Sequence, residues 1–189
     1  IEGKRLRLKQ QYLLVSASLQ SIVNNHLKHY GTLDSLPDKV AIHINDTHPA
    51  LCVPELMRLL MDEHGYGWDE AWAITCNTLS YTNHTVMSEA LECWSEDLVR
   101  SLLPRIYQIT KEIDNRYRGY AWSITYDADY VERTAVISNS SVRMANLCVV
   151  AGHCVNGVSA LHSQILKDTV FNDYYRHTPE KFTNVTNGI

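Results

Sequence analysis

The segment AIHINDTHPA, residues 41–50, is the most informative part of this sequence. Ile42 and Ile44 alternate with Ala41 and His43, which is the period-two pattern of a β-strand. Within four residues the segment then changes to Asn, Asp, Thr and His, whose side chains can cap a helix or hydrogen-bond a hydroxyl-rich ligand. We therefore predict a buried strand over residues 39–45 that ends in a polar loop.

The polar loop precedes a helical pattern, so its side chains lie at a strand-to-helix junction. Apolar residues recur at helical spacing over residues 50–64. Ligands of open α/β sheets bind outside the carboxyl ends of the strands, which makes Asp46 and His48 candidate site residues. A structural interpretation is open as well: Asp46 or Thr47 caps the helix, and His48 is a hydrogen-bonded wall residue.

The composition is that of an ordinary globular protein of 189 residues, with 45% hydrophobic residues, 20% charged residues and a net charge of −4. There is no basic stripe typical of nucleic-acid binding, and no apolar run of the roughly 18 residues that span a membrane. Residues 1–5 do not resemble a signal peptide. We expect a cytoplasmic protein with neither nucleic acid nor membrane as a partner. Because the chain begins without Met and stops within an apparent element, we also expect a piece of a longer protein.

The cysteines are odd in number and lie in apolar segments without paired CxxC spacing. This pattern predicts reduced core residues and argues against a disulfide framework or a zinc site. The five cysteines are Cys52, Cys76, Cys93, Cys148 and Cys154.

Helical and strand patterns alternate along the chain, which predicts an α/β protein with a largely parallel sheet. The predicted helices cover residues 6–28 and 50–64, and a third is capped by Asp69 and runs into the polar cluster 81–85. A fourth helical stripe covers residues 98–113 and is interrupted at Pro104. A fifth helix is opened by residues 155–157, and its inward residues are Val158, Leu161, Ile165 and Leu166. The predicted strands are residues 39–45, 135–137, 142–150 and 183–187, the middle two forming a hairpin or two adjacent strands.

Residues 118–134 have the least regular pattern. Their aromatic side chains either form a sugar-binding platform or anchor a connecting segment, and the sequence favours the second interpretation. These aromatic residues are Tyr120, Trp122, Tyr126 and Tyr130.

Several kinds of chemistry have little support. A metal site could be drawn from Asp46, His48, His84 and His153, but no histidine pair has the helical spacing of metal ligands, so we expect no metal. There is no G-x-S-x-G nucleophile elbow and no dinucleotide fingerprint. A hydrolytic carboxylate pair of Asp46 with Glu89 or Glu92 is conceivable. What remains is a set of neutral donors and acceptors near aromatic residues, which suits polyhydroxylated ligands.

Eight short motifs in order resemble the α-glucan phosphorylases, the glycogen and maltodextrin phosphorylase family. Each motif alone is short, but the ordered set is specific and covers nearly the whole chain. The motifs are HINDTHP (43–49), PELMR (54–58), YTNHT (81–85), EALE (89–92), LLPR (102–105), MANL (144–147), VNGV (155–158) and TNGI (186–189).

The resemblance implies the Rossmann-like half of an incomplete B-type glycosyltransferase fold. Residues 1–189 are then a single partial domain, the later part of the phosphorylase N-terminal domain up to the crossover. The family transfers a terminal α-1,4-linked glucose to phosphate with retention of configuration, and uses pyridoxal phosphate as an acid/base group. Its attachment lysine belongs to the C-terminal domain, so we expect no cofactor-binding residue in this chain.

The resemblance also implies roles for individual residues. His84 matches the catalytic-site histidine that holds the glucose, and Asn187 matches the asparagine that contacts its 6-hydroxyl. Asp46 and His48 match the loop that lines the cleft beside that glucose. Neutral groups of this kind can strengthen their hydrogen bonds as positive charge develops on the sugar ring.

The implied partners are α-1,4-glucan, phosphate, the absent C-terminal domain and a second copy of the full-length protein. We expect this chain to be inactive alone, because it supplies only the glucan side of the cleft. Two alternatives remain open: a stand-alone carbohydrate-binding module, and a scaffold fragment that self-associates through exposed apolar surface.

Overall fold

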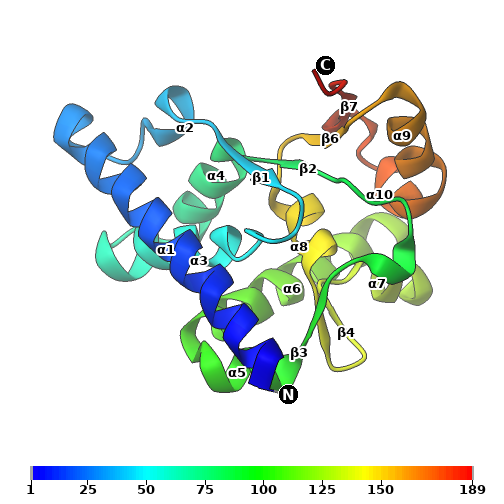
Figure 1. Cartoon of the computed structure of the whole chain (residues 1–189), viewed down its shortest axis with the longest axis horizontal. Coiled ribbons are helices and arrows are strands. Elements are labelled where there is room, and N and C mark those ends of the chain that lie inside the picture. Colours follow the sequence, from blue (N-terminus) through cyan, green and yellow to red (C-terminus); the bar gives the residue numbers. More distant parts are fainter. Residues whose placement is uncertain (1, 189) are drawn as a thin grey trace.

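The computed structural model describes residues 2–188 and has an α/β fold organised around a four-stranded parallel sheet (Figure 1). Its strands lie in the order β1 (Ile42–Asn45), β2 (Leu79–Thr82), β6 (Val155–Gly157) and β7 (Phe182–Asn184). All three neighbouring pairs are parallel. The predicted class, the parallel sheet and the strand over residues 39–45 are therefore confirmed.

The two faces of this sheet differ in chemistry. One row of paired residues, Ile44, Tyr81, Val155 and Phe182, is buried. The row one residue further along carries polar side chains on the opposite face, because successive side chains in a strand alternate. Most helices lie below the strands in Figure 1, and α3, α4 and α8 pack together beneath the apolar face.

A second, antiparallel sheet contains β3 (Cys93–Ser95), β5 (Ser141–Arg143) and β4 (Ile137–Ser138) in that order. Strands β4 and β5 form the predicted hairpin, turning at Asn139 and Ser140 with φ of 49° and 57°. The prediction of a strand over residues 142–150 is wrong beyond β5, because Met144–Ala151 is helix α8. Its residues are nearly all buried, and an apolar run without periodicity fits a buried helix as well as a strand.

Helices flank both sheets. The first is α1 (Glu2–Tyr30), which confirms the predicted helix over residues 6–28. The others are α2 (Leu36–Lys39), α3 (Cys52–Arg58), π-helical η1 (Leu59–Glu63), α4 (Trp68–Thr78), short η2 (Ser88–Ala90), α5 (Glu96–Leu102), α6 (Pro104–Thr125), α7 (Ala128–Thr134), α9 (Ala160–Ile165), π-helical η3 (Leu166–Val170), α10 (Asn172–Tyr175) and η4 (Pro179–Lys181).

Proline and glycine define several helix boundaries. Pro104 starts the separate helix α6, since a proline is tolerated in the first helical turn. Asp69 does not cap α4 as predicted: Gly67 occupies the N-cap position, and its N–H donates to the Glu70 carboxylate at 3.3 Å. Residues 118–134 form the end of α6 and helix α7, so the prediction of a connecting segment is wrong.

The other errors concern short strands. Residues 79–82 form β2, where we predicted a helix that continues into the polar cluster. Residues 155–157 form β6, and the following helix begins only at Ala160. Leu161, predicted to face inward, is 73% exposed. Strand β2 follows α4 with no intervening residue and β6 has only three residues, so their alternation was not distinguished from an adjoining helical pattern.

The cysteine prediction is only partly confirmed. All five cysteines are free; Cys52 and Cys148 are buried, whereas Cys93 is exposed. Burial raises the pKa of the Cys52 thiol to about 12, which keeps it protonated at neutral pH. Within residues 2–188, no helix is long and apolar enough to cross a membrane.

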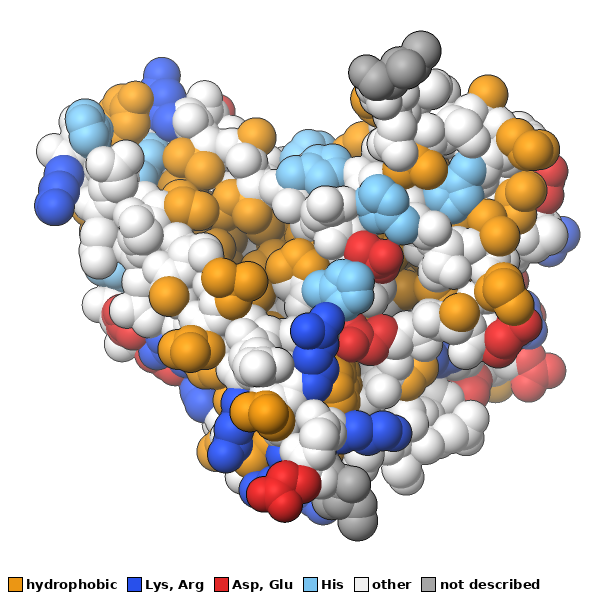
Figure 2. Space-filling model, in the orientation of Figure 1, with side chains coloured by type: hydrophobic (Ala, Val, Ile, Leu, Met, Phe, Trp, Pro, Cys, Tyr) orange, Lys and Arg blue, Asp and Glu red, His pale blue; other side chains and the backbone are white. Residues whose placement is uncertain are grey.

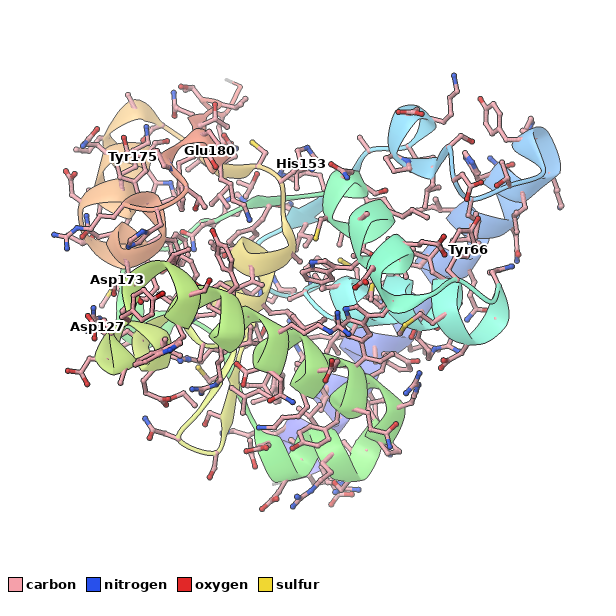
Figure 3. The ribbon with its side chains drawn as sticks, turned by 180° about the vertical axis from the view of Figure 1, so that it is seen from behind. Tyr66, Asp127, His153, Asp173, Tyr175 and Glu180 are labelled. Carbon is pink, nitrogen blue, oxygen red and sulfur yellow. The ribbon has the colours of Figure 1, made fainter. Side chains whose placement is uncertain are left out.

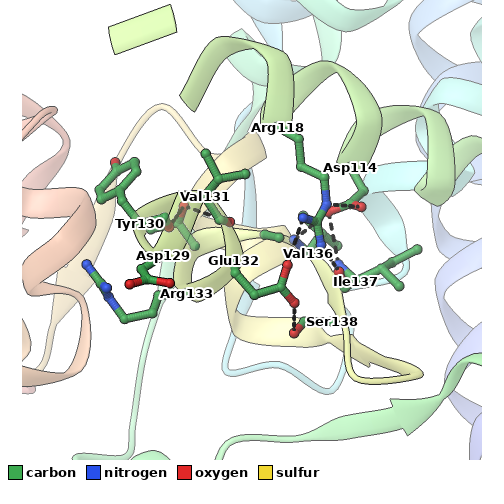
Figure 4. A network of polar contacts seen from close by, with 12 residues as sticks. Asp114, Arg118, Asp129, Tyr130, Val131, Glu132, Arg133, Val136, Ile137 and Ser138 are labelled. Carbon is green, nitrogen blue, oxygen red and sulfur yellow. Dashed lines mark hydrogen bonds and ion pairs between the residues drawn. The ribbon is translucent and has the colours of Figure 1, made fainter. Parts of the chain in front are cut away.

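A buried carboxylate fixes the antiparallel hairpin to α6 (Figure 4). Asp114 on α6 is fully buried and accepts hydrogen bonds from the backbone N–H groups of Val136 and Ile137 at 2.8 and 3.0 Å. Arg118 pairs with Asp114 at 2.9 Å and with Glu132 on α7 at 2.9 Å. The network joins α6, α7 and β4 and satisfies each charge that it buries.

Candidate functional site

A cleft of about 710 Å³ lies over the polar face of the parallel sheet, next to the C-terminal segment. Figure 2 shows this side of the molecule hollowed between two lobes, with several histidine side chains along the hollow. The cleft is lined by His43, Asn45, Ser80, Thr82, His84, His153, Cys154, Asn156, Thr183, Val185, Thr186, Asn187 and Gly188.

Strand register brings the lining side chains together. Asn45, Thr82, Asn156 and Thr183 are paired across all four strands, one residue beyond the buried row. The polar cleft therefore follows directly from side-chain alternation in parallel strands.

Thr82 is the centre of a hydrogen-bond network on this face. Its Oγ1 accepts from Asn156 Nδ2 at 3.1 Å and bonds His43 Nε2, while the other ring nitrogen of His43 bonds Ser80 Oγ at 2.8 Å. Burial lowers the pKa of His43, and the nearby His84 adds to this effect, which favours a neutral ring. Asn156 is only 6% exposed, and its Oδ1 is buried without a hydrogen-bond partner within the described structure.

The loop after β2 directs His84 into the cleft. Asn83 is fully buried: its backbone N–H donates to Asn156 O at 3.0 Å, and its Oδ1 accepts from Thr85 N–H at 2.9 Å. This turn fixes the backbone on both sides of the exposed His84. The Nε2 atom of His84 lies 2.6 Å from Asn45 Oδ1 at the end of β1.

Asn187 reaches the same cleft from the C-terminal segment. Val185 N–H donates to Gly157 O at 3.2 Å, and Asn187 N–H donates to Val158 O at 3.0 Å. These bonds hold the segment after β7 along the end of β6, so that Asn187 and His84 line one cavity. The structure thus brings together two of the predicted site residues, His84 and Asn187.

Asp46 and His48 lie in the adjoining loop and are not among the residues that line the cleft. Asp46 has φ of 60°, and its Oδ1 accepts from Thr47 N–H at 2.7 Å. Neither Asp46 nor Thr47 caps α3, whose N-cap position is Leu51. The hypothesis of a helix cap is therefore wrong, while a role beside a longer ligand remains a prediction.

Other side chains considered from the sequence make contacts within the described fold. Among residues 2–188, no group of three or more His, Cys, Asp or Glu side chains could hold a metal ion. His153, labelled in Figure 3, bonds Cys76 O through Nδ1 at 3.1 Å, at the opposite end of the strands from His84. Glu92 accepts from Gln11 at 3.0 Å and from Thr47 at 3.3 Å, so it links α1 to the loop after β1.

A second cavity, of about 410 Å³, lies between α4, α6 and the segment 174–181. Tyr120 and Tyr130, two of the aromatic residues noted in the sequence, line it. Trp122 and Tyr126 instead contact each other edge to face, with ring centroids 5.9 Å apart. The four residues therefore do not form one continuous platform.

The sequence model of the carbohydrate phosphorylase family matches residues 1–189. The chain belongs to the carbohydrate phosphorylase family. It is 54% identical to an α-glucan phosphorylase H isozyme of Triticum aestivum and 53% identical to a glycogen phosphorylase of Bacillus subtilis, each over the whole chain and 24% of the relative. It is 46% identical to the muscle form of glycogen phosphorylase from Ovis aries, again over the whole chain and 24% of the relative.

Membership in the phosphorylase family confirms the resemblance stated from the ordered motifs. The chain spans about a quarter of the length of these relatives. Sequence reasoning alone did not assign Asn45, Ser80, Thr82 or Asn156 to the cleft. Alternation within β1 already pointed His43 and Asn45 to one face, but the polar sides of β2 and β6 were hidden because those strands were not predicted.

Proposed function

We propose that the full-length protein is a glycogen or maltodextrin phosphorylase, which releases glucose 1-phosphate from α-1,4-glucan ends with retention of configuration. The observation that carries the proposal is the placement of His84 and Asn187 in one cleft at the carboxyl ends of parallel strands. The cleft walls carry neutral amide, hydroxyl and imidazole groups, which suit a ligand with many hydroxyls.

The proposal divides the reaction between two parts of the protein. Residues 1–189 form the later part of the N-terminal domain of a B-type glycosyltransferase fold and supply the glucan side of the cleft. The remaining chain supplies the phosphate side, including pyridoxal phosphate as the acid/base group. The full-length protein acts as a cytoplasmic homodimer; one relative, from Arabidopsis thaliana, is named a cytosolic α-glucan phosphorylase.

The residues described do not fit the cofactor itself. The partly buried Lys181 donates its Nζ hydrogens to Val149 O and Val150 O at 3.1 and 3.2 Å, and Arg118 is paired with two carboxylates. Neither cation faces the polar cleft. We therefore assign this chain the binding and orientation of the sugar, and derive no step through the cofactor.

His84 and Asn187 then hold the terminal glucose from two sides. Their hydrogen bonds keep the sugar ring oriented and become stronger as charge develops on it during bond cleavage. Asp46 and His48 extend the contact toward the rest of the glucan chain. None of these side chains acts as a nucleophile in this scheme.

The first test is phosphorolysis of maltoheptaose by the full-length protein, followed as glucose 1-phosphate release. We expect His84→Ala to lower kcat by roughly 100-fold, with a much smaller change in KM for glucan. His29→Ala is the matched control, since His29 is exposed near the end of α1, bonds Asn25 O and does not line the cleft, and it should change kcat by less than about threefold. An unchanged kcat in His84→Ala would remove the assigned role, and an inactive wild-type protein would refute the proposed activity.

A further inference from the structure

Asn45 and His84 meet across two adjacent strands. Asn45 is the last residue of β1 and is paired in register with Thr82, the last residue of β2. Asp46 N–H donates to Thr82 O at 2.9 Å, which fixes the end of β1 against β2. Two residues beyond Thr82, the His84 ring lies 2.6 Å from the Asn45 amide oxygen. The contact therefore rests on the sheet register of β1 and β2.

The identity of the contacting atoms determines where the imidazole proton lies. An amide oxygen can only accept a hydrogen bond, so the His84 Nε2 must carry the hydrogen that it donates to Asn45 Oδ1. In a neutral ring the second nitrogen, Nδ1, then has a lone pair and can only accept. Among the side chains that the structure describes, none is bonded to this Nδ1, and His84 lines the cleft.

We propose that Asn45 is a positioning residue that holds His84 in the Nε2-protonated tautomer, so that Nδ1 accepts a hydrogen bond from a hydroxyl of the bound sugar. This inference rests on the proposed function, because it gives a hydrogen-bond direction to the sugar contact of His84. The cleft site thereby selects a hydroxyl donor at this position and disfavours a group that can only accept.

Two further histidines lie beside His84. They are His43 on β1 and His162 on α9, and burial is the main cause that lowers the pKa of each. Electrostatic interaction with His84 lowers both pKa values further, while a backbone hydrogen bond with Thr85 partly raises that of His162. Val158 N–H donates to His162 Nδ1 at 3.1 Å, so His162 is itself held in a defined tautomer beside the same loop.

The test is a double-mutant cycle in the full-length protein, measured as kcat/KM for maltoheptaose phosphorolysis at pH 8. Asn45→Ala should lower kcat/KM by about 10-fold, the effect of one lost hydrogen bond. In the His84→Ala background the same change should have an effect of less than about twofold, because Asn45 acts through His84. Asn45→Asp keeps an acceptor and should recover activity to within about threefold of the wild-type protein at this pH.

A pH profile separates positioning from a general structural effect. The carboxylate of Asn45→Asp favours the doubly protonated ring, in which Nδ1 can no longer accept. Its activity should therefore fall at a higher pH than wild-type activity as the pH is lowered. The matched control is Asn77→Ala, whose side chain bonds Ala73 O on α4 and which should keep the wild-type rate and profile.

The outcomes distinguish the two levels of the proposal. If His84→Ala alone leaves the rate unchanged, the proposed sugar role of His84 fails. If His84→Ala lowers the rate but Asn45→Ala has no effect, or has the same effect in both backgrounds, the positioning role of Asn45 is overturned and the proposed function stands. The side chains of Asn45 and His84 are exposed, so the thermal unfolding midpoints of all variants should agree with that of the wild-type protein within a few degrees. A large drop in the unfolding midpoint of Asn45→Ala that Asn45→Asp does not recover would also overturn the positioning role.

Discussion

Gly157 lies where strand β6 packs directly against helix α9. A Cβ atom at this position would lie 2.3 Å from Ser163 Oγ and 2.8 Å from Ser163 Cα, closer than atoms can pack. Ser163 Oγ also donates to Asn184 Oδ1 at 2.9 Å, so the same contact joins β6, α9 and β7. Since the segment after β7 carries Asn187, this single residue helps to place one wall of the cleft.

We expect Gly157→Ala to destabilise the full-length protein by about 1–3 kcal/mol, because the added methyl group overpacks a backbone contact. Thermal unfolding followed by fluorescence measures the effect as a lower midpoint. Gly119→Ala on α6 is the control, since a Cβ there meets no atom within 4 Å and alanine favours a helix. Equal midpoints for the two variants would contradict the packing argument.

At the scale of elements, α1 is attached to α3 through a buried carboxylate. Glu55 on α3 is fully buried and accepts hydrogen bonds from Tyr12 and Ser16 on α1, at 2.8 and 2.7 Å, and from two nitrogens of Arg58. Burial raises the pKa of Glu55, but the hydrogen bonds from Arg58, Ser16 and Tyr12 outweigh this effect and leave the pKa below its ordinary value. The charged form of Glu55 therefore stabilises the folded state.

This contact predicts a pH dependence of stability. The contribution of Glu55 to the free energy of unfolding is complete above pH 4.5, the ordinary pKa of the carboxyl group. It is lost as the pH falls through the lowered pKa that Glu55 has in the folded state. We expect Glu55→Gln to lower the free energy of unfolding by about 3 kcal/mol at pH 7. The difference in thermal unfolding midpoint between this variant and the wild-type protein should become smaller below pH 4.5.

The control for this prediction is Glu63→Gln, which removes the more exposed partner of Arg58. The Arg58–Glu63 ion pair contributes at most about 1 kcal/mol to the free energy of unfolding, because water screens it. A difference between Glu55→Gln and wild type that stays constant from pH 7 to pH 3 would show that the charge of Glu55 does not stabilise the α1–α3 contact.

At the scale of the whole molecule, the polar cleft lies on a face of the parallel sheet that the described residues leave uncovered. The polar face of its parallel sheet is open, whereas helices normally cover both faces of such sheets. Leu6, Leu13 and Leu14 on α1 are 56%, 71% and 70% exposed, which is unusual for three leucines on one helix. Both features are expected if the remaining three quarters of a phosphorylase pack against this part.

We therefore expect the 189-residue chain, produced alone and supplied with pyridoxal phosphate, to release no glucose 1-phosphate from maltoheptaose under conditions in which the full-length protein does. The reason is that a sugar held from one side only is neither shielded from water nor oriented toward phosphate. Turnover by the 189-residue chain would show that the catalytic groups are placed wrongly in our scheme.

Local patterns predicted much of the fold. The alternation at Ile42 and Ile44 identified β1, and the long stripes identified α1 and the α5–α6 pair, because amphipathic periodicity persists over many residues there. The buried run over residues 144–151 has no polar face, so its helix was mistaken for a strand. Strand β2 was not recognised because it follows α4 with no intervening residue, and β6 because three residues carry too few alternations.

The sequence by itself determined the family, the α/β class and the identity of His84 and Asn187 as candidates, because ordered motifs and apolar periodicity are properties of the chain alone. Only the tertiary structure decided which residues share the cleft. His84 and Asn45 are 39 positions apart, and nothing local marks them as partners. They meet because parallel pairing of β1 with β2 aligns the carboxyl ends of both strands at one edge of the sheet.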